Sequence, residues 1–280
     1  MKQRIITALI LAPLVILGIF FLPLPGFIAA MSAVTLLGFW EWTQFVPSRS
    51  RITALIPALV VMAASLVWVP LDVSRLNTPS CAHYGILSIG VVWWLVASAM
   101  AMVFPKLSQR WQSPRLLRHL FGILTLLPFL WSVLLLRAEA INTDPYHGAK
   151  LVLFVCLLVW SADSGAYFAG KSFGKRKMAP NVSPNKTIEG LLGGIVVAML
   201  VSWGAAMLFN ITFSSPSSML IITLVTVVIS VLGDLVESMF KRVAGIKDSG
   251  SIIPGHGGIL DRIDSLTAAF PVFTFLYLIF

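Results

Sequence analysis

Two short groups of acidic and hydroxyl side chains near the C-terminus have the residue types and spacing that suit binding of phosphate through a metal ion. Asp234, Glu237 and Ser238 stand at positions i, i+3 and i+4, so they share one face of a helix. The segment DRIDS, residues 261–265, repeats that spacing. Oxygen ligands in this number suit Mg²⁺, which proteins typically hold with one or two carboxylates and substrate phosphates; zinc would take His or Cys.

The segment between these groups, KRVAGIKDSGSIIPGHGG, combines glycine with basic residues. Gly255, Gly257 and Gly258 allow the backbone to approach a ligand closely, with N–H groups turned toward an anion. His256 is either a turn residue or an acid–base group, and no neighbour in the sequence fixes its tautomer. Four basic side chains in or beside the segment are predicted to bind phosphate: Lys241, Arg242, Lys247 and Arg262.

Three acidic residues lie inside apolar runs, where an ionisable side chain costs at least about 2.5 kcal/mol. Asp163, Asp234 and Glu41 each lie seven or eight residues from a basic residue, which places them at a similar depth, roughly 10–12 Å from one membrane face. This agreement predicts a polar cavity shared by Asp163 and Asp234. The alternatives are interhelical polar contacts for Asp163 and Glu41, and an ion pair of Asp234 and Asp261 with Arg262 or Lys241.

The elements that position these groups are membrane spans. Of the 280 residues, 58% are hydrophobic and 11% charged, with a mean hydropathy of +0.92, whereas soluble domains have about 25% charged residues. A spanning helix needs about 20 predominantly apolar residues. Nine such blocks occur: 5–22, 26–45, 53–70, 85–105, 118–136, 150–169, 188–209, 217–239 and 258–280. We therefore predict an all-α polytopic membrane protein with nine transmembrane helices.

Basic residues predict the orientation of these spans. When the loops are assigned alternately to two sides, 17 of the 20 Lys and Arg residues fall on the side of the N-terminus. The other three are Arg75, Arg137 and Lys150. The positive-inside rule then predicts a cytoplasmic N-terminus and a periplasmic C-terminus. Topology and anionic lipid headgroups account for the net charge of +9, and no nucleic-acid partner is needed.

Acidic residues divide the chain into two unequal parts. We predict one integral membrane domain, 1–280, in which the five spans of residues 1–137 form a helical scaffold. The four spans of residues 150–280 form the catalytic half, because most intramembrane carboxylates and both motif loops lie there.

The stretch GAYFAGKS, residues 165–172, fits the nucleotide-binding pattern G-x-x-x-x-G-K-[ST] at every fixed position. A true loop of this kind follows a strand and opens a helix whose N-terminus holds the phosphates. Here an apolar span precedes it, and Gly174, Pro180 and Pro184 prevent a long helix from starting there. We interpret the match as accidental, although Lys171 at the mouth of the predicted cavity is still a candidate for phosphate binding.

Three stretches resemble the signature of the phosphatidate cytidylyltransferases, also called CDP-diacylglycerol synthases. The first is SMFKRVAGIKDSGSIIPGHGGILDRIDS, residues 238–265. The others are WSADSGAYFAGKSFGKRKMAPNVSPNKTIEG, residues 160–190, and GDLVES, residues 233–238. The resemblance covers roughly residues 151–268, and the N-terminal half resembles the family only in hydropathy.

This resemblance implies an enzyme that makes CDP-diacylglycerol and pyrophosphate from CTP and phosphatidic acid with Mg²⁺. It implies that Asp234 and Asp261 hold the metal, with a second cation such as K⁺ compatible, and that residues 238–265 form the nucleotide site. It also implies a nine-helix homodimer in the cytoplasmic (inner) membrane of a bacterium, in contact with membrane lipids. The motif loops would face the cytoplasm, where CTP is found.

Spacing, charge and resemblance together predict the following site. The catalytic residues are Asp234, Asp261, Asp264, Lys247 and Arg262. The substrate-binding residues are Lys171, Lys186, Ser238, Lys241, Arg242, Asp248, His256, Gly257 and Gly258, and the polar cavity contains Asp163 and Glu237. A phosphatidate oxygen attacks the α-phosphorus of CTP, so catalysis is mainly positioning and charge stabilisation. Because the phosphate is already anionic, no general base is required.

Two other classes of function compete with this interpretation. A secondary transporter for an anionic solute would also place carboxylates near mid-membrane, but it predicts paired halves, and the acidic residues here are lopsided. A CDP-alcohol phosphotransferase also uses membrane-embedded Asp and Mg²⁺, but its D-G-x-x-A-R arrangement is absent from the sequence. Pyrophosphate release separates the enzyme from the transporter.

Overall fold

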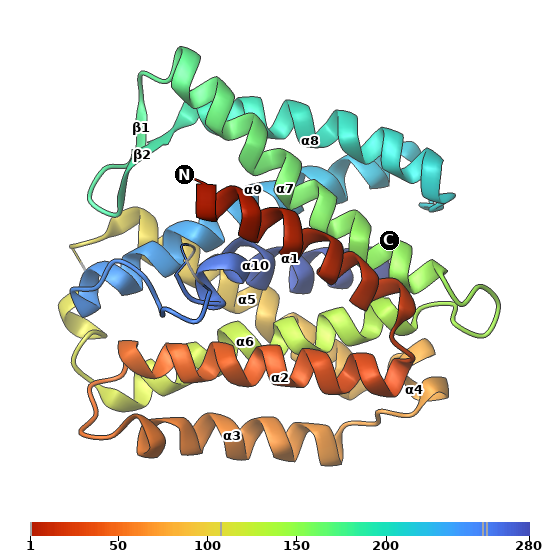
Figure 1. Cartoon of the computed structure of the whole chain (residues 1–280), viewed down its shortest axis with the longest axis horizontal. Helices are drawn as coiled ribbons and strands as arrows, with labels where there is room; N and C mark the ends of the chain where they lie inside the picture. Colours follow the sequence, from red (N-terminus) through yellow and green to blue (C-terminus); the bar gives the residue numbers. More distant parts are fainter. Residues whose placement is uncertain (1, 107, 254, 256) are drawn as a thin grey trace.

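The computed structural model describes residues 2–106, 108–253, 255 and 257–280. The chain forms a bundle of long helices with one small hairpin (Figure 1). Its α-helices are α1 (Lys2–Phe21), α2 (Leu24–Trp42), α3 (Arg51–Trp68), α4 (Val73–Asn77), α5 (Cys81–Val103), α6 (Arg115–Ala138), α7 (His147–Phe173), α8 (Ile188–Phe209), α9 (Pro216–Ala244) and α10 (Leu260–Ile279). Two 3₁₀ turns, η1 (Thr43–Phe45) and η2 (Ser108–Arg110), follow α2 and α5, and the strands are β1 (Lys177–Ala179) and β2 (Ser183–Thr187).

Eight of the described helices are long and apolar enough to cross a membrane, and residues Leu9–Phe21 of α1 form a shorter apolar helix. Each predicted span corresponds to one of these nine, so the prediction of an all-α polytopic membrane protein is confirmed. In Figure 1 the N-terminus lies near the end of the bundle that carries the hairpin, and the C-terminus lies toward the other end. That arrangement is the one expected for an odd number of spans.

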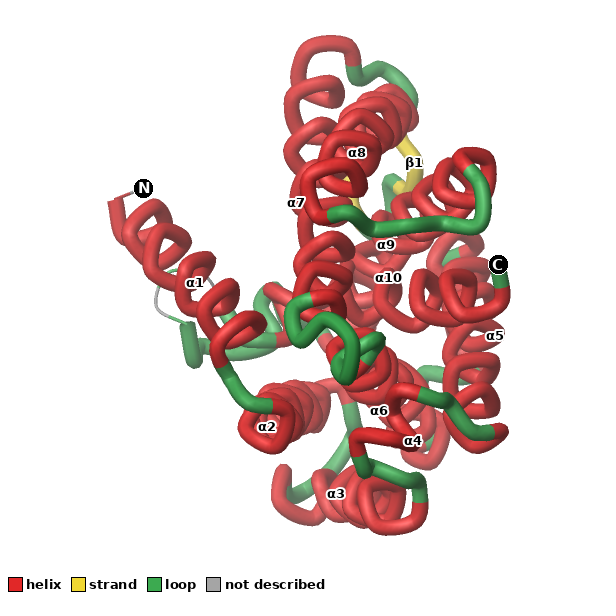
Figure 2. Tube along the Cα trace, turned by 90° about the vertical axis from the view of Figure 1, so that its right-hand side faces the viewer, coloured by secondary structure: helices red, strands yellow, loops and turns green. Residues whose placement is uncertain are grey.

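The core lies where α6, α9 and α10 meet. Helix α10 packs against α9, α6, α5 and α7, and Figure 2 shows it near the middle of the bundle. Large side chains such as Trp94, Phe154, Phe240 and Phe273 are fully buried in this core. By contrast, α3 lies at the edge of the bundle and is mostly exposed. The centrally placed α9 and α10 are the helices that carry the two acidic groups.

The β1–β2 hairpin was not expected from the sequence. Its strands pair antiparallel with Lys177 opposite Thr187 and Ala179 opposite Ser183. Pro180 lies in the connection, where a residue without an N–H donor is tolerated. Backbone and side-chain bonds to Glu189 from Lys175 and Arg176 hold the base of the hairpin. The hairpin thus gives the connection between α7 and α8 a defined shape.

The GAYFAGKS stretch lies entirely within α7, so the structure excludes a phosphate-binding loop there. Its glycines serve the packing of α7 on α8. A Cβ added to Gly165 would lie 2.9 Å from Val197 Cβ and 3.0 Å from the Gly193 carbonyl oxygen. Lys171 is exposed, and its Nζ lies 6.0 Å from the centre of the Tyr167 ring. The structure therefore does not bring Lys171 to the acidic groups.

Replacing Gly165 with Ala is expected to destabilise the protein by about 1–3 kcal/mol, the usual effect of forcing a methyl group into a close-packed interface. The measurement is the thermal unfolding temperature of the purified variant in lipid nanodiscs. Gly85→Ala on α5 is the matched control, because a Cβ there meets no atom within 4 Å. Equal unfolding temperatures for the two variants would contradict the packing role of Gly165.

Candidate active site

The first half of the site is built on α9 and β2. Asp234 and Ser238 lie on one face of α9, and the Ser238 hydroxyl donates to Asp234 Oδ1 at 3.3 Å. Lys186 reaches the same carboxylate from β2, with its Nζ 2.6 Å from Asp234 Oδ2. It also donates to the Val231 carbonyl oxygen at 3.2 Å. The hairpin is thus the element that delivers Lys186 to the carboxylate.

The second half of the site joins α9 to α10 through Lys241. Its Nζ lies 2.8 Å from Asp261 Oδ1 and 3.3 Å from Glu237 Oε1. All three side chains are at most 14% exposed. Neither carboxylate oxygen of Glu237 has a hydrogen-bond partner among the described residues. One buried lysine therefore serves two buried carboxylates, which realises one of the ion-pair alternatives left open by the sequence.

The loop between α9 and α10 wraps around the carboxylate of Asp261. Asp261 Oδ2 accepts from the N–H groups of Ser249 and Gly258, each at 2.8 Å. A Cβ on Gly257 would lie 2.6 Å from the same oxygen, so only glycine permits this approach. The predicted closeness of the loop backbone to an anion is present, but in this structure the anion is Asp261 itself.

Carboxylates outnumber the lysines that are paired with them. Asp234, Glu237 and Asp264 interact electrostatically with one another, and Glu237 and Asp264 also interact with Lys241. Asp163, although exposed on α7, is within electrostatic range of Asp234, and so belongs to the same polar region. This surplus of carboxyl oxygens over lysines suits a cation.

The carboxylates at this site can hold Mg²⁺ only if water and substrate phosphate oxygens complete its coordination. No group of three or more His, Cys, Asp or Glu side chains among the described residues is arranged to hold a metal ion. Mg²⁺ is usually bound by one or two protein carboxylates and completed by water and substrate phosphate oxygens. Asp234 and Asp261 supply two carboxylates of the kind that this smaller requirement needs, and the buried carboxyl group of Glu237, without hydrogen bonds in the described chain, places two more oxygens beside Lys241.

Four further predicted residues lie on α9, on α10 or in the loop between them. Arg242 is exposed, and its Nε donates to the Val182 carbonyl oxygen at 3.1 Å, which ties the hairpin to α9. Arg262 is exposed and interacts with Asp163. Lys247 and Asp248 are exposed on the loop. His256 lies outside the described residues.

Two polar residues of the N-terminal half also reach the site: Glu41, whose role the sequence left open, and Gln44, which the sequence analysis did not single out. Glu41 near the end of α2 is 1% exposed and accepts hydrogen bonds from the loop, and Gln44 donates to the Ser249 carbonyl oxygen. The available signal was that Glu41 is the only acidic residue in the first five spans and that Gln44 follows at i+3 on the same helical face.

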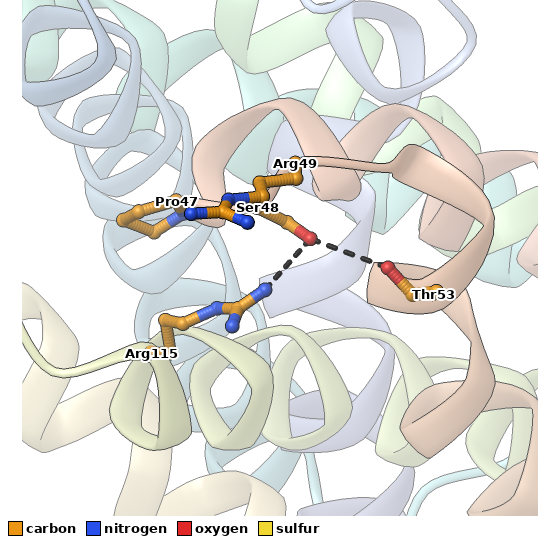
Figure 3. A pocket seen from close by; sticks show the side chains of 5 residues that line it. All are labelled: Pro47, Ser48, Arg49, Thr53 and Arg115. Carbon is orange, nitrogen blue, oxygen red and sulfur yellow. Dashed lines mark hydrogen bonds between the residues drawn. The ribbon is translucent and has the colours of Figure 1, made fainter.

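Two cavities lie at the same end of the molecule. One of about 320 Å³ is bordered by Glu41, Gln44, Arg51 and Asp248, between α2, α3 and the loop. The other, of about 490 Å³, is lined by Pro47, Ser48, Arg49, Thr53 and Arg115 (Figure 3). In the second, an Arg115 nitrogen donates to the Ser48 hydroxyl at 2.8 Å, and no carboxylate lines the wall. Both of its arginines, Arg49 and Arg115, are exposed.

Comparison with known proteins covers the whole chain. Residues 2–280 match the model of the Cytidylyltransferase family. The phosphatidate cytidylyltransferase of Haemophilus influenzae is 42% identical over 99% of this chain and 98% of its own. That of Pseudomonas aeruginosa is 39% identical over 99% and 96%, and that of Bacillus subtilis is 48% identical over 51% and 52%. The similarity thus extends beyond the motif region into the N-terminal half.

Proposed function

Since this chain belongs to the cytidylyltransferase family and is a nucleotidyltransferase, we propose that it transfers the CMP moiety of CTP to phosphatidic acid. A phosphate oxygen of phosphatidic acid forms a bond to the α-phosphorus of CTP. The bond from that phosphorus to the bridging oxygen breaks, and pyrophosphate leaves, so that CDP-diacylglycerol is the product. The observation that supports this assignment is the cluster of Asp234, Asp261, Lys186 and Lys241 in a chain matched over its full length by proteins of this name.

Positioning and charge are the tasks of the protein in such a reaction. Lys186 and Lys241, which are held against Asp234 and Asp261, are suited to exchange those carboxylates for phosphate oxygens of the substrates. The exposed Arg242, Lys247 and Arg262 would attract CTP to the site. The attacking oxygen carries a negative charge before it reacts, so no side chain has to remove a proton from it.

Asp234 and Asp261 would hold Mg²⁺, and a second cation such as K⁺ is compatible with the remaining carboxylates. When bound, the metal would neutralise charge on the phosphates. The contribution of the chain is to fix Asp261 through two backbone N–H groups and to keep Asp234 beside Lys186. These contacts restrict both carboxylates before any ligand arrives.

We also propose the membrane in which the protein lies and its oligomeric state. The protein is an integral membrane protein, and we propose the cytoplasmic membrane of a bacterium with the site facing the cytoplasm. The excess of basic residues at the end that carries the hairpin and the α9–α10 loop supports this orientation. There the acyl chains of phosphatidic acid stay in lipid while its headgroup meets CTP. We further propose that the protein forms a homodimer, as the family resemblance implies.

Purified protein in mixed micelles is expected to release pyrophosphate only when CTP, phosphatidic acid and Mg²⁺ are all present. Excess EDTA should stop the release, and added Mg²⁺ should restore it, because Lys186 and Lys241 alone do not balance the negative charge of a triphosphate. Release without phosphatidic acid would indicate simple nucleotide hydrolysis. Absence of release with every lipid tested, together with uptake of an anionic solute by vesicles, would favour the transporter.

A further inference from the structure

Glu41 occupies a position at the site that the proposed reaction does not explain. It lies on α2, more than 200 residues from the residues that it contacts. Its Oε1 accepts from the Ile259 N–H at 3.0 Å, and its Oε2 accepts from the Leu260 N–H at 2.7 Å. Ile259 precedes α10 and offers no side-chain cap of its own. Glu41 therefore caps the N-terminus of α10 from another helix, where a negative charge also favours the helix dipole.

The same carboxylate reaches Asp261 through one intermediate residue. The Ser249 hydroxyl, which is fully buried, donates to Glu41 Oε2 at 3.1 Å and accepts from the Asp261 N–H at 3.2 Å. The Ser249 N–H donates to the Asp261 carboxylate, and its carbonyl oxygen accepts from Gln44. Every polar group of Ser249 is thus used to connect α2 to Asp261.

The loop is shaped to receive this carboxylate. A Cβ on Gly250 would lie 2.8 Å from Glu41 Cδ, and one on Gly258 would lie 2.5 Å from the same atom. Two loop segments therefore enclose Glu41 at distances that only glycine allows. None of the ion pairs among the described residues includes Glu41. In that part of the chain its carboxylate is held by hydrogen bonds from the loop and from α10.

We propose that Glu41 is a positioning residue, which fixes the α9–α10 loop and the first turn of α10 so that Asp261 is held in its working orientation. Without the Glu41 carboxylate, the N-terminus of α10 would lose its cap and the Ser249 hydroxyl would lose its acceptor. Both the backbone and the carboxylate of Asp261 would then be less restrained. Figure 1 shows the C-terminal end of α2 and the α9–α10 loop at the same end of the bundle. The activity part of the test rests on the proposed function, and the structural part does not.

The structural test is hydrogen exchange of the Glu41→Gln variant in lipid nanodiscs, without CTP, phosphatidic acid or Mg²⁺. Gln presents an NH₂ group to donors that need an acceptor, so the Ile259 and Leu260 amides, which donate to Glu41, should exchange about tenfold faster. Amides within the membrane spans should not change. Thr35→Val is the matched control, because Thr35 is buried on the same helix and its hydroxyl has no hydrogen bond in the described chain.

The functional test measures the Mg²⁺ concentration that gives half-maximal pyrophosphate release. Loss of a residue that orients a metal-binding carboxylate typically reduces metal affinity or activity by about 10–100-fold, and a shift of that size is expected for Glu41→Gln. Ser249→Ala should produce a similar shift. Since both act on Asp261 through one connection, the double variant should lie within about threefold of the worse single variant.

The outcomes separate the possible failures. Unchanged exchange at Ile259 and Leu260 in Glu41→Gln would overturn the capping role. Faster exchange across all spans, with a lower unfolding temperature, would reduce Glu41 to a general structural residue. If the shift in Mg²⁺ concentration for the double variant equals the product of the two single-variant shifts, the two residues act independently. That result would overturn the connection through Ser249. If the wild-type protein releases no pyrophosphate, the proposed function fails, while the exchange experiment still decides the role of Glu41.

Discussion

Asp261→Asn is expected to lower pyrophosphate release by about 10²–10⁴-fold, because removing one partner of a buried ion pair typically costs about 3–5 kcal/mol. Asp261 has three functions in this structure. It accepts from the buried Lys241, it receives two loop N–H groups, and it is the proposed Mg²⁺ ligand on α10. Asn keeps the size of the side chain but offers one acceptor oxygen in place of two. The measurement is kcat/KM for CTP at saturating phosphatidic acid, with the unfolding temperature as a check on folding.

Asp144→Asn provides the matched control for this change. Asp144 forms an aspartate–lysine pair of similar length, 3.0 Å to Lys150, but it lies partly exposed in the loop between α6 and α7, at the opposite end of the bundle from the α9–α10 loop. A pair of this kind contributes at most about 1 kcal/mol, so activity should stay within about twofold. Activity that survives Asp261→Asn would show that the metal and catalytic assignments are wrong even if the reaction is right.

Lys241→Met is expected to have the largest effect on stability. Lys241 is the cation shared by Glu237 and Asp261, and both carboxylates are 5% exposed. Met replaces the stem but not the charge, and two buried carboxylates are left facing each other. A loss of about 3–5 kcal/mol is expected, since an uncompensated buried charge is what makes the breaking of such pairs costly. The thermal unfolding temperature in nanodiscs should fall by several degrees, and activity should be lost.

A second variant distinguishes charge from packing as the cause. Adding Glu237→Gln to Lys241→Met removes one of the two unpaired carboxylates, so part of the lost unfolding temperature should return. Activity should not return, because Asp261 still lacks its lysine. If the double variant is no more stable than Lys241→Met alone, the loss is due to packing around the side chain and not to the unpaired charge.

The sequence by itself determined the fold class and predicted which residues form the candidate site. Nine apolar blocks are recognisable in the sequence without any tertiary contact, because the bilayer makes hydrophobicity and length sufficient evidence of a helix. Eight of the described helices have spanning length, and the first block contains a shorter apolar helix. The i, i+3, i+4 spacing on α9 is equally local, and the structure shows the Asp234–Ser238 contact that it predicts. The same local reasoning rejected the GAYFAGKS match, which the structure places inside α7.

Only the tertiary structure decided which charged groups meet. The sequence offered Lys241 and Arg262 as partners for the aspartates, but Lys186 is the partner of Asp234, and it arrives on a hairpin that apolar periodicity cannot reveal. The partners of Glu41 were hidden for a similar reason, because its hydrogen bonds join residues more than 200 positions apart in the sequence. Periodicity and spacing report only neighbours within a few turns of one helix, whereas the pairing of buried charges depends on which helices lie side by side.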